Sequence, residues 1–278
     1  MPTYRLTVEY EGTRYRGWQE QKNARTVAGE LRSALEGVLG ESVDLGGAGR
    51  TDAGVHALAQ TAHLRCRVAM DPSELLFQVN EALPPDINLL ALSPAARDFH
   101  ARHSAVSRSY LYQVARRRTA FAKRHVWWVR AALDGERLAR EAQAAVGRHD
   151  FARLAERSAA QDSTEVVVEQ VRVAEAGDLL LIRIVASHFL WKMVRRLVGT
   201  LVRVAAGNLP PGTLAALLAD DARTATLNPA EWTAPPSGLF LERVIYPGDP
   251  ALGVLRAATP VGEVPSRARP AKGESATG

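Results

Sequence analysis

The sequence has 278 residues, 46% of them hydrophobic, and a formal net charge of +5, so it is long enough for two ordinary domains. Its apolar stretches are interrupted by charges, as Arg183 interrupts 179–185, which excludes a membrane span. Cys66 is the only cysteine, which excludes an internal disulfide, and the chain shows no apolar leader, so we expect a cytoplasmic protein.

The first part of the chain predicts a β-α-β-β-α-β order. Residues 3–10 alternate apolar and polar, as in a strand. Thr26 can cap a helix that Gly40 ends, and Asp71-Pro72 can open a second helix. The remaining strands are expected at 42–46, 58–66 and 87–92. This order favours a split ferredoxin-like half over residues 1–106.

The second part, 107–247, predicts another mostly antiparallel sheet backed by helices. The expected strands lie at 110–114, 126–129, 164–174, 179–186 and 239–246, and the expected helices at 134–146, at 188–206 and after Pro211. We therefore expect an α+β fold of two ferredoxin-like halves with an active-site cleft between them. Residues 248–278 are rich in Pro, Gly, Ala and Ser, which predicts a disordered tail.

Histidine and arginine usage gives weaker indications. The seven histidines form no H-x-x-x-H or H-E-x-x-H pair, so we expect no metal. The basic residues are mostly arginine, which reflects either genomic base composition alone or a polyanionic partner. Clusters at 116–118, 123–124 and 192–196 favour the polyanion, although charged runs are usually solvated faces.

The run Gly46–Ala57 is the most informative stretch, because it places Asp52 in a glycine-rich loop. Glycine lets the backbone approach a ligand closely. An acid in such a loop can serve as nucleophile or base, with Arg50 keeping it ionised or binding a phosphate. The alternative is that Asp52 is a turn residue that binds its own backbone.

Several further blocks support a resemblance to a known family. They are Tyr10 to Thr13 with Gly17 to Gln21, Ala48 to Ala57 with Gln60, Phe99 to Arg102 with Tyr110 to Tyr112, Phe189 to Arg195, and Gly238 to Leu241 with Tyr246. These blocks follow one another in the order found in the tRNA pseudouridine synthase A family, and the chain closely resembles that family over about residues 3–247.

This resemblance implies a homodimer that isomerises uridine to pseudouridine at positions 38, 39 and 40 of the tRNA anticodon stem-loop, with no cofactor or metal. It implies that Asp52 is the catalytic aspartate and that Arg50, Tyr110 and Arg195 are its active-site and substrate-binding partners. The chain departs from the family pattern at Ala28, Ser163 and 153–154.

The chemistry of the reaction agrees with these residues. Isomerisation is neither a redox reaction nor driven by a nucleotide, which fits the missing P-loop and G-x-G-x-x-G motifs. We expect Arg195 to pair with Asp52, Arg50 to hold the everted nucleotide or fill its place, and Tyr110 to lie against the uracil. Without the resemblance, Tyr110 reads as a core aromatic and Arg195 as part of a solvated helix face.

Two residues of the matching blocks remain unassigned. His56 reads as a loop or supporting residue, and Trp18 as a packing residue or a stacking platform for a base. Two other functions compete with isomerisation: an RNA-binding protein without catalysis, and a hydrolase with an aspartyl nucleophile.

Overall fold

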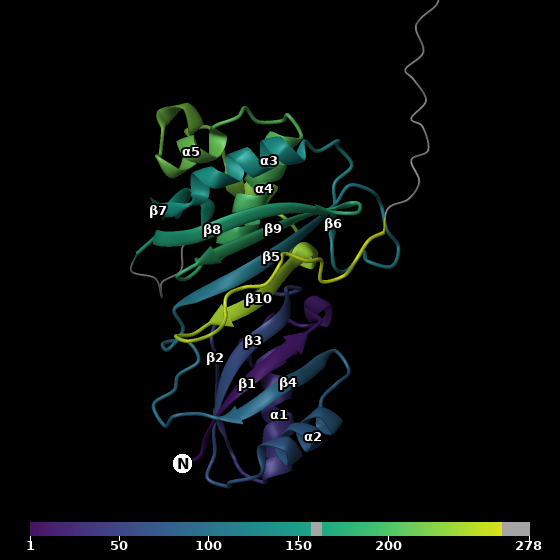
Figure 1. The fold of residues 1–278 in the computed structure, drawn as a ribbon, viewed down its shortest axis with the longest axis vertical. Helices are drawn as coiled ribbons and strands as arrows, with labels where there is room; N and C mark the ends of the chain where they lie inside the picture. Colours follow the sequence, from purple (N-terminus) through teal and green to yellow (C-terminus); the bar gives the residue numbers. More distant parts are fainter. Residues whose placement is uncertain (157–162, 263–278) are drawn as a thin grey trace, which may run out of the picture.

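The computed structural model describes residues 1–156 and 163–262. These residues form one ten-stranded sheet (Figure 1). Eight of its strands follow the order β4-β1-β3-β10-β5-β9-β8-β7, while β2 pairs with β3 and β6 pairs with β5. The strands are β1 (Thr3–Tyr10), β2 (Asp44–Gly47), β3 (His56–Arg65), β4 (Ile87–Pro94), β5 (Ser107–Ala115), β6 (Trp127–Trp128), β7 (Gly147–Asp150), β8 (Glu165–Ala176), β9 (Leu179–Ala186) and β10 (Leu239–Ile245).

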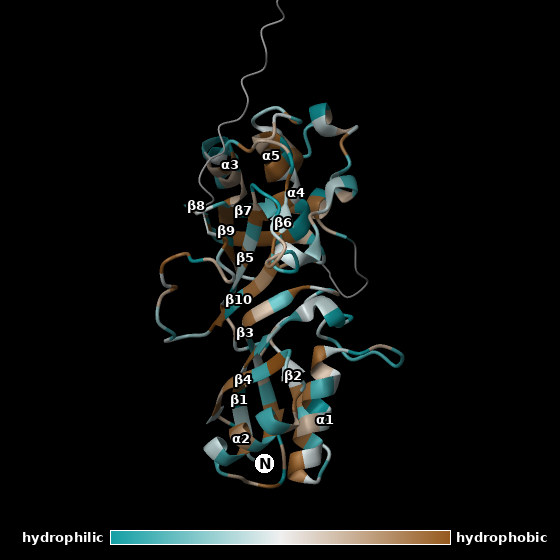
Figure 2. Cartoon of the chain, turned by 90° about the vertical axis from the view of Figure 1, so that its right-hand side faces the viewer, coloured by the Kyte–Doolittle hydropathy of each residue, from teal (hydrophilic) through white to brown (hydrophobic). Residues whose placement is uncertain are grey.

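The N-terminal half packs α1 (Val27–Leu39) and α2 (Pro72–Ala82) against β1, β3 and β4. Leu6 and Val8 of β1 are fully buried in the core that both helices share. The Thr26 hydroxyl accepts a hydrogen bond from the Gly29 amide at 3.3 Å and caps α1, which carries both hydrophobic and hydrophilic residues (Figure 2). The predicted β-α-β-β-α-β order is confirmed.

The C-terminal half packs α3 (Gly135–Ala142) and α4 (Met193–Ala205) against β5, β8 and β9, and α5 (Thr213–Leu218) against α3 and α4. The α+β fold with a mostly antiparallel sheet backed by helices is therefore confirmed. Strand β7 was not predicted, and α4 begins five residues later than expected because 187–192 form a turn that ends at Lys192, whose φ is +60°. Within the described ranges, no helix is both long and apolar enough to cross a membrane.

Strand β10 joins the two halves into one sheet. It pairs with β5 in antiparallel fashion, with Leu241 opposite Tyr110, and with β3 in parallel fashion, with Phe240 opposite His56. In Figure 1 it lies between the two groups of strands. We expected two separate sheets with a cleft between them. A strand has two hydrogen-bonding edges, however, and both edges of β10 are used, so the sheets are continuous behind the site.

Residues 249–262, called the strap below, differ from the predicted disordered tail. Asp249 pairs with Arg5 at 3.1 Å, and Val261 is buried in an apolar cluster with Leu179 and Phe240. The strap carries little periodic apolar signal in the sequence, and side chains of the sheet bind several of its backbone groups: the Gln113 amide oxygen accepts from the Ala258 amide at 2.7 Å. The rest of the predicted tail, 263–278, lies outside the described residues.

Candidate active site

Asp52 lies in the turn that connects β2 to β3. Its carbonyl oxygen accepts a hydrogen bond from the Val55 amide at 3.1 Å, and Gly54 provides the left-handed φ of +77° that the turn needs. Its side chain is 25% exposed. The carboxylate is thus held on a short, closed turn and still reaches solvent.

The segment that follows β1 packs against this turn and holds it in place. Gly17, with φ of +93°, lies so close to the Thr51 carbonyl that a Cβ would collide with it. The Trp18 amide donates to the same carbonyl at 3.1 Å, and the hydroxyl groups of Tyr10 and Thr51 lie 2.7 Å apart. The Trp18 ring is buried and fills the space that Gly47 leaves open. Trp18 is therefore a packing residue in this structure.

Arg195, near the start of α4, forms the expected ion pair with Asp52. Its Nη1 lies 3.2 Å from Oδ2 of Asp52, and its side chain is 15% exposed. Its Nε donates to the Ala234 carbonyl at 2.7 Å, which fixes the plane of the guanidinium. One arginine thus connects the α4 side of the molecule to the glycine loop, and its positive charge lies against the Asp52 carboxylate.

Tyr110 lies on β5 beside this ion pair. It is 8% exposed, and the edge of its ring meets Phe189, with ring centroids 4.8 Å apart. Burial and the nearby negative charge of Asp52 both raise the pKa of Tyr110 above its ordinary value, so the phenol keeps its proton at neutral pH. The hydroxyl can therefore donate a hydrogen bond or a proton but cannot act as a resting phenolate.

Arg50 stands apart from the other three predicted residues. It is exposed, and its Nε donates to Oε1 of Gln19 at 3.1 Å. The structure therefore brings together Asp52, Tyr110 and Arg195 and leaves Arg50 on the surface of the same loop.

Comparison with known proteins decides the family. The family described as tRNA pseudouridine synthase matches residues 6–104 and 142–247. A tRNA pseudouridine synthase A of Agrobacterium fabrum (strain C58) is 40% identical over 252 residues, which cover 89% of this chain and 93% of the relative. The chain belongs to the tRNA pseudouridine synthase family.

Other relatives and structures extend the comparison. A tRNA pseudouridine synthase A of Rhodopseudomonas palustris (strain BisA53) is 39% identical over 249 residues, or 88% of this chain and 100% of that one. A chain from a crystal structure of a Cbf5-Nop10-Gar1 complex aligns with a TM-score of 0.32 and 10% identity, covering 71% of this synthase and 53% of that chain. Membership of the family makes this protein an isomerase.

Arg108 is a residue of the site that sequence reasoning missed. It lies two positions before Tyr110 on β5, and its guanidinium donates to three carbonyls: Ala48 at 3.2 Å, Arg102 at 2.7 Å and Ser187 at 3.0 Å. Burial lowers the pKa of its guanidinium. Arg108 thus holds the start of the glycine loop to the end of β9. Carbonyl partners leave no signal in a sequence.

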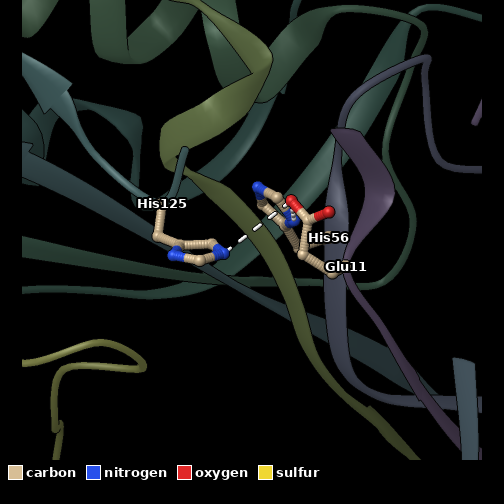
Figure 3. Close-up of side chains that lie close together, drawn as sticks. All are labelled: Glu11, His56 and His125. Carbon is tan, nitrogen blue, oxygen red and sulfur yellow. Dashed lines mark ion pairs between the residues drawn. The ribbon is translucent and has the colours of Figure 1, made fainter. Parts of the chain in front are cut away.

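Glu11, His56 and His125 form the one cluster of metal-type ligands found among the described residues (Figure 3). The Glu11 Oε1 lies 3.6 Å from Nδ1 of His56 and 3.7 Å from Nε2 of His125. The Gly12 amide donates to Nδ1 of His56, and Nε2 donates to the Arg124 carbonyl. A metal needs an unprotonated nitrogen with a free lone pair, which His56 does not offer. We therefore assign no metal to this cluster of the synthase.

Proposed function

We propose that this synthase converts uridine to pseudouridine at positions 38, 39 and 40 of the tRNA anticodon stem-loop, with Asp52 as nucleophile or base. The observation that carries the proposal is the Asp52–Arg195 ion pair, because it fixes the carboxylate of the glycine loop near a protonated tyrosine in a member of this family. The three positions rest on the resemblance to tRNA pseudouridine synthase A alone.

The reaction breaks the bond between ribose C1′ and uracil N1, rotates the base and joins C1′ to C5. The proton on C5 is lost and N1 gains one, so atoms and electrons balance without a cofactor. Asp52 supplies the negative charge that attacks the base or the sugar, or that removes a sugar proton. The Tyr110 hydroxyl assists proton transfer at C5, and Arg195 holds the Asp52 carboxylate in place through their ion pair.

The substrate base must leave the helical stack to reach Asp52. Unstacking and unpairing a uridine cost on the order of a few kcal/mol, which contacts to phosphates must offset. We assign Arg50 to this task, because it is exposed on the loop that carries Asp52 and its only partner in the described part of the chain is the neutral Gln19.

Tritium release tests the reaction. Unmodified tRNA labelled with tritium at uracil C5 should release tritium when it is incubated with the protein, with no chain cleavage and no added cofactor. Substrates that keep one uridine among the three positions then identify which are modified. Release from none of them, with retained tRNA binding, supports the RNA-binding alternative, and chain cleavage supports the hydrolase.

We further propose that the protein is a cytoplasmic homodimer. Each chain would consist of two domains that meet at residues 106–107. The partner subunit is physically sensible, because a tRNA extends beyond the surface that one chain of this size offers. Light scattering coupled to size exclusion measures the mass of the free protein, and a mass of 30.1 kDa would overturn the dimer.

A further inference from the structure

His56 has no role in the chemistry described so far, although it follows Asp52 by four residues. It is the first residue of β3 and is 1% exposed. Its ring stacks on Phe240 of β10, with centroids 4.8 Å apart and 28° between the planes. A polar ring buried at this joint needs partners for both nitrogens.

Both nitrogens of His56 bind backbone groups from different segments. The Gly12 amide donates to Nδ1 at 3.0 Å, which leaves the proton on Nε2, and Nε2 donates to the Arg124 carbonyl at 2.9 Å. One neutral imidazole therefore connects three parts of the chain: the turn after β1, the segment between β5 and β6, and β10.

These contacts reach the Asp52 turn through Gly12. The Gly12 backbone lies so close to the Val55 carbonyl that a Cβ would collide with it. The Val55 amide in turn closes the turn on the Asp52 carbonyl at 3.1 Å. His56 thus holds Gly12 in place, and Gly12 holds the end of the catalytic turn.

Through Phe240, the His56 ring also contacts the half of the molecule that carries Tyr110. Phe240, on which His56 stacks, is followed by Leu241, which lies opposite Tyr110 in the β10–β5 register. His56 is also opposite Phe240 in the parallel β10–β3 pairing, which consists of two residue pairs. The stacked ring adds a side-chain contact to this short pairing.

We propose that neutral His56 is a positioning residue, which keeps the Asp52 turn aligned with Tyr110 and Arg195 by accepting the Gly12 amide and stacking on Phe240. The inference rests on the proposed function, because it assigns His56 a part in the same site. If His56 has this part, the alignment of the Asp52 turn with Tyr110 and Arg195 depends on the protonation state of His56.

The charged groups around His56 set that dependence. From the turn after β1, Glu11 faces the ring at 3.6 Å, and from the segment after β5, His125 faces it with centroids 5.2 Å apart. Glu9 and Asp86 line the adjoining pocket. Phe240 on β10 is apolar, and the strap adds only Ala258 and Thr259 to the pocket.

Burial is the largest effect and lowers the pKa of His56. Glu11 opposes this shift and His125 adds to it, and the net direction is below the ordinary value. Protonation would place a hydrogen on Nδ1 against the Gly12 amide. The bond is therefore intact at neutral pH and is lost as pH falls through the pKa of His56.

Matched substitutions test the proposal. The amide oxygen of asparagine can take the place of Nδ1, whereas that of glutamine lies farther out. We expect His56→Ala and His56→Gln to lower kcat by about ten- to a hundredfold, with KM and tRNA affinity within about twofold. His56→Asn should recover most of the loss, and His149→Asn, on β7, should leave all parameters unchanged. Circular dichroism and melting curves confirm that each variant is folded at the assay temperature.

The pH profile separates this role from simple support of the fold. In the parent protein kcat/KM should fall as pH drops below the ordinary histidine range, and in His56→Asn this decline should move to lower pH, because the variant has no imidazole at this position to protonate. An unchanged profile, or an Asn variant no faster than the Ala variant, overturns the proposal. Absence of tritium release from the parent protein would overturn the proposed function instead.

Discussion

The guanidinium of Arg195 and the carboxylate of Asp52 are separated by 143 positions in the chain and lie 3.2 Å apart in the fold. Each comes from a different half, and each is held by its own segment: Asp52 by the turn between β2 and β3, Arg195 by the Ala234 carbonyl. The pair is only partly exposed, so its mutual attraction is stronger than that of a surface ion pair.

Removing the acid should separate catalysis from binding. We expect Asp52→Asn to reduce tritium release by roughly a thousandfold or more, because the amide can neither attack nor accept a proton. Affinity for tRNA, measured by filter binding, should stay within about twofold, since Arg195 remains and attracts phosphate. If binding falls as much as turnover, Asp52 is a structural residue of the turn.

Arg195→Lys keeps the positive charge but replaces the planar guanidinium, with its several N–H donors, by a single ammonium group. One ammonium group cannot reach both Asp52 and the Ala234 carbonyl in the geometry that Nη1 and Nε use. We expect kcat to fall by about ten- to a hundredfold with little change in KM. Arg203→Lys is the matched control, because Arg203 lies on the same helix and stacks on Trp232, 4.9 Å from its ring centroid. Equal losses in both variants would contradict the assignment.

Gly17→Ala should displace the catalytic turn. The left-handed φ of Gly17 costs an alanine about 1–2 kcal/mol, and the collision with the Thr51 carbonyl adds to this. We expect a lower free energy of unfolding in urea and a large loss of kcat. Gly37→Ala, on the exposed face of the last turn of α1 with open space around it, should instead gain about 0.5–1 kcal/mol and keep full activity. A Gly17→Ala variant with normal kcat would show that the contact does not position Asp52.

Arg50→Gln should weaken binding in a salt-dependent way. If Arg50 contacts a phosphate, its loss should lower tRNA affinity and reduce the slope of log K against log salt by about one. Arg97→Gln provides the comparison, because Arg97 is also exposed in the N-terminal half but lies beside Met70 and Pro94 rather than on the loop that carries Asp52. The same slope in parent and Arg50→Gln proteins would mean that Arg50 contacts no phosphate.

Stability should fall in mild acid because of His63. Burial, followed by the charges of His100 and Arg65, lowers the pKa of His63 to about 4. Between that value and the ordinary 6.5 the unfolded chain binds a proton that the folded chain does not, so stability is complete above the ordinary value and declines as pH falls. The loss should reach about 2 kcal/mol between about pH 6.5 and pH 5. Urea unfolding at the two pH values measures it, and His63→Gln should show a smaller difference, whereas His149→Gln should not.

Local sequence patterns were sufficient to predict most of the elements. The alternation in 3–10, the cap at Thr26 and the Asp71-Pro72 start all depend on neighbours a few residues away, and each element formed where expected. The ion pair of Asp52 with Arg195 followed from a resemblance that covers both halves at once, and composition or periodicity alone would have left Arg195 on a solvated face.

Features that depend on distant partners were not predicted. The position of β10 between β3 and β5 is decided by two sheet edges, and the strap is held by the side chains of Arg5, Gln113 and Arg183. The contacts of Arg108 are with carbonyls, which every residue carries, so no residue type marks them. Contacts of this kind can be identified only in the folded structure.

The placement of β10 also has a consequence for synthesis of the protein. Translation proceeds from the N-terminus, and among the described residues β10 is the last strand to be made although it lies in the middle of the sheet. The two halves can begin to fold while the ribosome is still elongating the chain. Because β10 joins the half that carries Asp52 to the half that carries Arg195, we expect the acid and the arginine to align only after this strand has emerged.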